Sequence, residues 1–180
     1  LILYMSTNKI KSYGKLVIET EISGAKKLFK TINSDFARVI SKLSKIKGKV
    51  IITGVGKSGH IASKISSTMS STGTLSQYCS PTDMSHGDLG IISKNDAIII
   101  ISNSGKSEEF KSLLDFAKKN KVFVIGITSN AKSTLYKLCD IPLLIPNSKE
   151  ACSIGLAPTT STTMSSVSYT HLRAHETIDD

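Results

Sequence analysis

Apolar runs that alternate with polar, helix-like stretches constrain the fold of this chain more than any other feature. Strand-like runs are KVIIT (49–53), LSQYC (75–79), AIIII (97–101), VFVIGIT (122–128) and IPLLI (141–145). Helical patterns are expected at 9–31, from Asn33 or Ser34 to about Lys47, and at 58–72, 107–120, 133–139 and from about 157. Strands separated by helices form parallel sheets that are covered on both faces. We therefore predict an α/β protein with a five-stranded parallel sheet flanked by helices on both faces, in Rossmann-like or flavodoxin-like layering.

The charge of the chain raises the question of a nucleic-acid partner. The net charge is +9 over 180 residues, a length that suits one domain with a real core. Most of the excess lysine lies at 9–49 and 111–137, among apolar residues at helical spacing and with few aromatics. No helix-turn-helix or RNA-binding signature accompanies it. We interpret these lysines as the solvated faces of helices and expect no nucleic-acid partner.

Three features indicate a cytoplasmic protein. The aliphatic run within DAIIIIS (96–102) is far too short to span a bilayer, so no membrane contact is expected. The apolar start is followed rather than preceded by lysines, unlike a secretory signal, and we expect residues 1–8 to be disordered or non-native. Cys79, Cys139 and Cys152 are odd in number and lack metal-type spacing, which favours reduced thiols.

The segment GVGKSGH (54–60) follows the first expected strand. A nucleotide P-loop would need a glycine where Ile51 stands, so that class is excluded. The spacing G-x-G-x-x-G fits a dinucleotide site, but that site expects an acid about twenty positions further on. The second strand supplies no acid until Asp83, which weakens the dinucleotide interpretation. Small residues, a helix N-terminus and Lys57 still favour binding of an anion.

A second loop of the same kind follows the third expected strand, in IISNSGKSEEF (100–110). Ser104 or Ser107 can cap the next helix, and Glu109 suits its first turn. Capping accounts for one serine but not for hydroxyls at 102, 104 and 107 beside a glycine. Clustered hydroxyls and backbone N–H groups bind phosphate esters, so a sugar phosphate is the expected ligand.

Four motifs together resemble a known family. They are GVGKSGH (54–60), SHGDLG (85–90), SNSGKSEE (102–109) and EACSIGLAPTTSTT (150–163). These motifs are similar to the sugar isomerase (SIS) domain of bacterial arabinose-5-phosphate isomerases, in register from about residue 13 to 166. The resemblance implies interconversion of ribulose 5-phosphate and arabinose 5-phosphate for Kdo and lipopolysaccharide synthesis. Family members usually have glutamate where this chain has Lys106, which alters the charge of the phosphate loop.

The resemblance implies four catalytic residues for this chemistry. Isomerisation through an enediol needs a base, a group that stabilises an oxyanion, and a grip on the phosphate. The residues that match the family's active site are Lys57, His86, Glu109 and Glu150. Each has a plainer alternative: a solvated loop lysine, a structural histidine, a helix-terminal glutamate and a loop charge. The mechanism needs neither a metal nor an organic cofactor.

The remaining expected site residues hold the substrate. They are Gly56, Ser58, Ser102, Asn103, Ser104, Gly105, Ser107, Thr159 and Thr160. Pro158 is expected near the start of a helix whose amino end faces the site. We expect partial burial to raise the pKa of Glu150 toward working pH, which would make it a stronger base.

The carboxyl-terminal part departs from the family pattern. We expect a SIS domain at 9–167, followed by an atypical, non-native tail at 168–180, SYTHLRAHETIDD, in place of the usual pair of CBS modules. The resemblance implies a homo-oligomer, most simply a homotetramer. The alternative from another class is a non-catalytic, regulatory SIS domain that binds a sugar phosphate. A NAD-type dehydrogenase is weakened by the missing acid.

Overall fold

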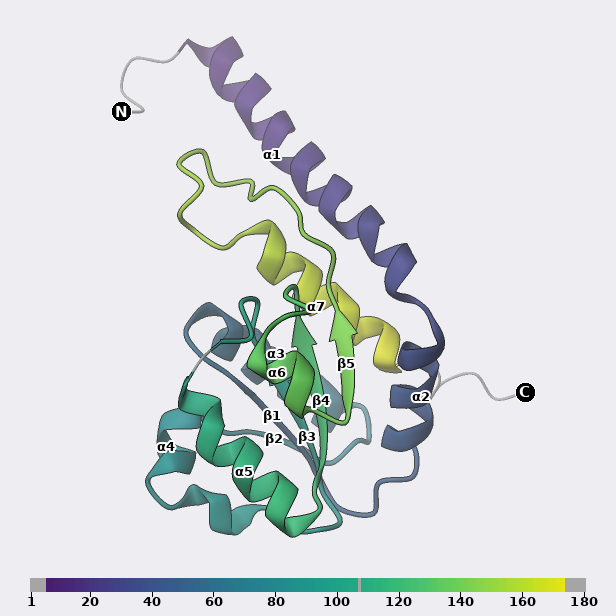
Figure 1. Cartoon of the computed structure of the whole chain (residues 1–180). Coiled ribbons are helices and arrows are strands. Elements are labelled where there is room, and N and C mark those ends of the chain that lie inside the picture. Colours follow the sequence, from purple (N-terminus) through teal and green to yellow (C-terminus); the bar gives the residue numbers. More distant parts are fainter. Residues whose placement is uncertain (1–5, 107, 174–180) are drawn as a thin grey trace, which may run out of the picture.

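The computed structural model describes residues 6–106 and 108–173 and contains one parallel sheet (Figure 1). Its strands are β1 (Val50–Gly54), β2 (Ser76–Tyr78), β3 (Ala97–Ile101), β4 (Phe123–Thr128) and β5 (Ile141–Leu144). They lie in the order β2-β1-β3-β4-β5, and every neighbouring pair is parallel. The predicted five-stranded parallel sheet is confirmed.

The helices occupy most of the expected positions. They are α1 (Thr7–Lys27), η1 (Leu28–Thr31), α2 (Ser34–Leu43), α3 (Lys57–Ser71), α4 (Pro81–Ser85), η2 (Asp88–Ile91), η3 (Glu108–Phe110), α5 (Lys111–Asn120), α6 (Thr134–Leu138) and α7 (Thr160–Arg173). Asn33 caps α2, because its side chain accepts from the backbone N–H groups of Asp35 and Phe36. The last helix begins at Thr160, later than expected. The short helices α4 and η2 were not expected.

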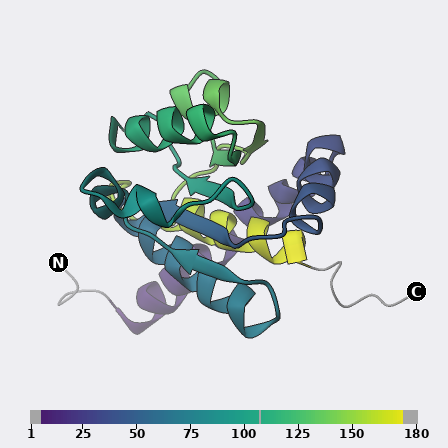
Figure 2. The same ribbon diagram turned by 90° about the horizontal axis from the view of Figure 1, so that it is seen from below.

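Helices cover both faces of the sheet, as predicted. Successive strand residues point to opposite faces, so Ile52 and Ile99 pack with Ile65 of α3 and Met164 of α7, beneath α1 and α2. The other face carries α4, α5 and α6, whose buried apolar residues form a second cluster. Figure 2 shows α5 and α6 on one side of the sheet and α3 and α7 on the other. None of the described helices is long and apolar enough to cross a membrane.

The strand order places two of the expected ligand loops side by side. From β1 the chain moves to β2 on one side, and β3 then pairs with the other side of β1. Gly54 and Ile101, the last residues of β1 and β3, are direct partners in the sheet. The loops that follow them therefore leave the same edge at a topological switch point, where open α/β sheets bind ligands.

Candidate functional site

The turn from β1 into α3 brings strand and helix into close contact. A Cβ on Gly54 would lie 2.8 Å from the carbonyl carbon of Ser58, and one on Gly59 would lie 2.6 Å from the Gly54 oxygen. Gly56, the N-cap of α3, has a φ of 56°, which side chains rarely adopt. These glycines let the backbone turn tightly from β1 into α3.

The loop after β3 is fastened to its neighbours. The Ser102 hydroxyl accepts from the Gly105 N–H at 3.1 Å, and the Asn103 carbonyl accepts from the Ser129 N–H at 3.0 Å. Gly105 has a φ of 64°, and a Cβ there would collide with Ser133. The loop is thus held in one shape by β4 and the turn beyond it. Ser107, an expected ligand of the phosphate, lies outside the described residues.

A cavity of about 500 Å³ lies between these two loops and α7. It is lined by Val55, Lys57, Ser58, Ser102, Asn103, Ser104, Lys106, Pro158, Ser161, Thr162 and Ser165. Five of these residues were singled out from the sequence as catalytic or substrate-binding: Lys57, Ser58, Ser102, Asn103 and Ser104. The structure therefore brings the two predicted loops together around one space.

The groups around this cavity suit an anion. Lys57 and Lys106 supply cations, and Ser58 and Ser161 stand in the first turns of α3 and α7. Amino ends of helices carry partial positive charge and free N–H groups. The Ser161 hydroxyl oxygen is buried in the lining of this cavity, close to the Glu150 carboxylate.

The Glu150 carboxylate is hydrogen-bonded to the amino end of α7. Its Oε2 accepts from the Thr159 N–H at 2.7 Å, the Thr159 hydroxyl at 3.0 Å and the Ser161 N–H at 3.2 Å. Partial burial opposes its charge, but the nearby Ser161 hydroxyl and these hydrogen bonds outweigh burial and hold the pKa of the carboxyl below its ordinary value. The expectation that burial raises this pKa is wrong, because the helix terminus supplies donors that the sequence does not reveal.

The other expected site residues do not line the cavity. Glu109 is in η3, and His86 follows α4; both are exposed. The Thr159 hydroxyl bonds to Glu150, and the Thr160 hydroxyl bonds to Glu21 at 3.0 Å. Gly56 and Gly105 shape the two loops without lining the cavity. The roles assigned to these residues stay predictions.

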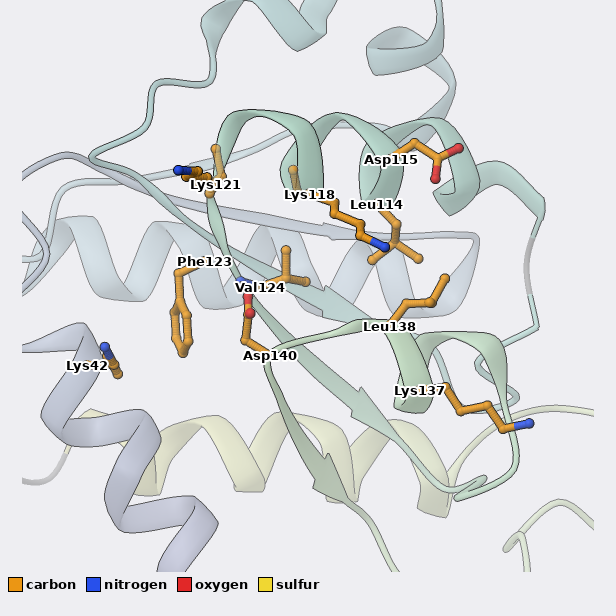
Figure 3. A pocket seen from close by; sticks show the side chains of 12 residues that line it. Lys42, Leu114, Asp115, Lys118, Lys121, Phe123, Val124, Lys137, Leu138 and Asp140 are labelled. Atoms are coloured by element: carbon orange, nitrogen blue, oxygen red, sulfur yellow. Dashed lines mark hydrogen bonds between the residues drawn. The ribbon is translucent and has the colours of Figure 1, made fainter.

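A second cavity, of about 620 Å³, lies at the opposite end of the sheet (Figure 3). Its lining includes Lys42, Lys118, Lys121 and Lys137. These lysines stand at or near the carboxyl ends of α2, α5 and α6, where cations offset the partial negative charge of the helix termini. The carboxyl ends of these helices disfavour an anion, so we do not assign the phosphate to this cavity.

The amino end of α7 was expected at the site, but the side chains by which α7 lines the cavity were not. Ser161, Thr162 and Ser165 line it, whereas the sequence pointed to Thr159 and Thr160. The spacing of Ser161 and Ser165 is the signal that could have found them, since residues four apart share a helix face. No group of three or more His, Cys, Asp or Glu side chains in the described chain is arranged to hold a metal ion.

The parallel sheet, the glycine-containing loops and the cavity between them define an α/β protein with a candidate anion site at its switch point. The SIS domain model matches residues 42–173, and the chain belongs to the SIS domain family. It is 46% identical over 150 residues to an arabinose 5-phosphate isomerase KdsD of Yersinia pestis, covering 83% of this chain and 46% of that protein. It is also 41% identical over 157 residues to an uncharacterized protein of Rickettsia prowazekii, covering 87% of this chain and 49% of that protein. The chain thus spans about half the length of these relatives.

Two solved structures resemble this chain. A protein of Escherichia coli CFT073, solved in complex with arabinose 5-phosphate, aligns with a TM-score of 0.88 and 36% identity, covering 93% of this chain and 90% of that one. The sugar isomerase domain of an RpiR transcription factor from Sphaerobacter thermophilus aligns with a TM-score of 0.68 and 16% identity, covering 88% of each chain. The second likeness supports the fold alone.

Proposed function

We propose that this chain is the catalytic domain of an isomerase that interconverts D-arabinose 5-phosphate and D-ribulose 5-phosphate. The observation that carries the proposal is the cavity where Lys57 and the serine hydroxyls meet the amino ends of α3 and α7. Sites of this composition bind phosphate esters through helix N–H groups, hydroxyls and a cation. The names of the relatives in the same family supply the substrate.

The phosphate would bind to the two loops at the edge of β1 and β3. Ser58, Ser102 and Ser104 offer hydroxyls, with Gly56, Asn103, Gly105 and Ser107 forming the surrounding backbone. Binding energy gained there holds the sugar carbons toward α7 and the Glu150 segment. Thr159 and Thr160 support that segment through their hydrogen bonds.

Glu150 is the proposed base. From the aldose it removes the C2 proton, and the enediol that forms takes the proton back at C1 while a hydroxyl proton moves from O2 to O1. A lowered pKa keeps Glu150 ionised at neutral pH but makes it a weaker base. Stabilisation of the developing oxyanion by Lys57 therefore has to carry more of the catalysis.

Glu109 and His86 complete the proposed catalytic set. Both lie outside the cavity lining of a single chain, so we propose that the site is completed in a homo-oligomer, most simply a homotetramer. We further propose a cytoplasmic role in Kdo and lipopolysaccharide synthesis. The names of the relatives and the three free cysteines support this setting.

One observation favours a second function. The Glu150 oxygen is held by backbone and side-chain donors, and Glu109 and His86 stand away from the cavity. A domain that binds the sugar phosphate without turning it over, as a sensor, would have this arrangement. The phosphate grip is common to both functions, so binding alone does not separate them.

Proton exchange separates the two functions. The full chain is incubated with ribulose 5-phosphate in heavy water, and NMR follows both arabinose 5-phosphate and exchange of the transferable hydrogen. We expect both for the wild type, and for Glu150→Gln a turnover lower by roughly 10²–10⁴-fold with nearly unchanged binding by calorimetry. The matched control is Glu19→Gln, an exposed glutamate on α1. Binding without exchange in the wild type would establish the sensor, and wild-type exchange in Glu150→Gln would exclude Glu150 as the base.

A further inference from the structure

Helix α1 lies beside α7 and touches the segment that carries Glu150 (Figure 1). We call residues 145–159, between β5 and α7, the Glu150 loop. The Thr160 hydroxyl donates to Oε1 of Glu21 at 3.0 Å and accepts from the Ala151 N–H at 3.1 Å. A short chain of hydrogen bonds therefore connects α1 to the residue next to Glu150.

The other end of the Glu150 loop is also attached to α1. The Lys27 ammonium group donates to the Asn147 carbonyl at 3.0 Å and to the Ser148 hydroxyl at 3.3 Å. Lys27 thus contacts the loop before Glu150, and Glu21 contacts Thr160 just beyond the end of the loop. Both contacts come from one helix, although the residues they join are far apart in the sequence.

The backbone of α1 sits directly against the first turn of α7 between these two contacts. Gly24 is buried, and a Cβ there would collide with the methyl group of Thr160. Glu21 and Gly24 are three positions apart and so share one helix face. This face of α1 is therefore fitted to the start of α7 and to the loop that precedes it.

Glu21 is held in an unfavourable environment. Its Oε2 atom is buried and has no hydrogen-bond partner among the described residues. Burial of a carboxylate oxygen without a partner is costly, and a group of this kind in a native fold calls for an explanation. Packing alone does not explain a glutamate at this position, because an apolar side chain would fill the same space without the cost of burying a carboxylate oxygen.

We propose that Glu21 is a positioning residue, which fixes Thr160 and Ala151 and thereby holds the Glu150 carboxylate at the amino end of α7. This inference rests on the proposed function, in which Glu150 is the base. It adds a part of α1, remote from the cavity lining, to the catalytic apparatus. A displacement of about 1 Å in a catalytic group can lower turnover by up to roughly 10²-fold.

Steady-state kinetics with three variants test the catalytic part. We expect Glu21→Ala to lower kcat by about tenfold or more while KM stays within about threefold, because the phosphate loops do not involve Glu21. Glu21→Gln should keep kcat within about threefold of the wild type, since the amide oxygen can still accept from Thr160. Glu19→Ala, on the exposed side of α1, is the matched control and should change neither constant. An equal loss in Glu21→Gln and Glu21→Ala, or a loss in KM alone, would overturn the proposal.

The proposed positioning of the Glu150 carboxylate by Glu21 can be tested without measuring activity. NMR titration of the Glu150 carboxyl carbon should show its lowered pKa rising toward the ordinary value in Glu21→Ala but not in Glu19→Ala, with faster exchange of the Thr159 and Ser161 amides. Thr160→Val, which removes the same hydrogen bond from the other side, should give the same change if Glu21→Ala does not fold. Unchanged titration and exchange in a folded variant would overturn the inference. If the variants show these changes but the wild-type chain has no isomerase activity, only the proposed function is overturned.

Discussion

The three cysteine thiols of this chain stand in three different environments. Burial raises the pKa of Cys79, and it raises that of Cys139 to about 11. Cys152, in the Glu150 loop, faces the backbone N–H groups of Ala157 and Ile154, which lower its pKa. Because the thiolate is the reactive form, Cys152 should be the most nucleophilic of the three.

We predict that iodoacetamide at neutral pH alkylates Cys152 first. Peptide mass spectrometry over a time course measures the modified fraction at each cysteine, and Cys152→Ser should abolish the fast phase. The reagent should modify Cys79 and Cys139 much more slowly, because burial raises the pKa of both thiols and leaves less of each as thiolate. Equal rates at all three positions in the folded chain would contradict the prediction.

At the scale of residues, the identity of the site side chains could be predicted from the sequence better than their surroundings. Lys57 and the loop serines could be placed from their position after a strand, and the structure brings them together around one cavity. The pKa of Glu150 could not be predicted, because its donors belong to the backbone of a helix whose starting point was misplaced. Glu21 was missed because its partner, Thr160, is 139 positions away.

At the scale of elements, one buried carboxylate fastens the starts of β1 and β3. Asp96 accepts from the Lys49 N–H and the Ser93 N–H, each at 2.8 Å, and lies 3.7 Å from the Lys49 ammonium group. Burial opposes its charge, but these N–H donors and the Lys49 cation outweigh it and hold its pKa below the ordinary value. Asp96 therefore aligns the two strands whose far ends carry the loops that border the cavity.

We predict that Asp96→Asn destabilises the fold at neutral pH by about 1–3 kcal/mol, the range for a lost hydrogen bond to a charged group. A group with a lowered native pKa stabilises the fold above its unfolded pKa, and this stabilisation is lost as pH falls through the native pKa. The difference between variant and wild type should thus shrink below about pH 4. Urea unfolding at pH 7 and pH 3 measures it, with the exposed Asp115→Asn as control. A pH-independent difference would contradict the prediction.

The elements themselves were largely predictable, and the exceptions have physical reasons. Buried parallel strands such as AIIII (97–101) are continuous apolar runs, which leave little ambiguity. The segment containing α4 is short and rich in turn-forming residues, although Pro81 at its start is a known helix-opening signal. The late start of α7 depends on the hydrogen bonds that Glu150 makes, which are tertiary contacts.

On the scale of the whole molecule, α1 leaves much apolar surface uncovered in the single chain. Ile18 is 61% exposed and Ile22 is 48% exposed, one turn apart on α1, and Leu156 in the Glu150 loop is 83% exposed. Exposed apolar surface of this kind marks a site of protein association. The same helix that contacts the Glu150 loop thus also leaves apolar side chains exposed.

We predict that the chain forms a homo-oligomer in solution and that Ile18→Lys weakens it. A buried ammonium group at an apolar interface is costly, so the variant should shift toward monomer. Multi-angle light scattering measures the mass, and Ser12→Lys adds the same charge at an exposed polar position of α1 as a control. A wild-type chain that is monomeric at all concentrations would contradict the prediction.

The contact between Glu21 and Thr160 also has a consequence for the synthesis of the protein. The two residues are 139 positions apart, and translation at about 5–20 residues per second separates their appearance by roughly 7–28 s. During that interval Gly24 and Glu21 have been made, but the turn of α7 that covers them has not. A ribosome therefore completes the sheet before it can complete the support of Glu150, and a chain stalled before Thr160 would have all five strands but no helix terminus to hold that carboxylate.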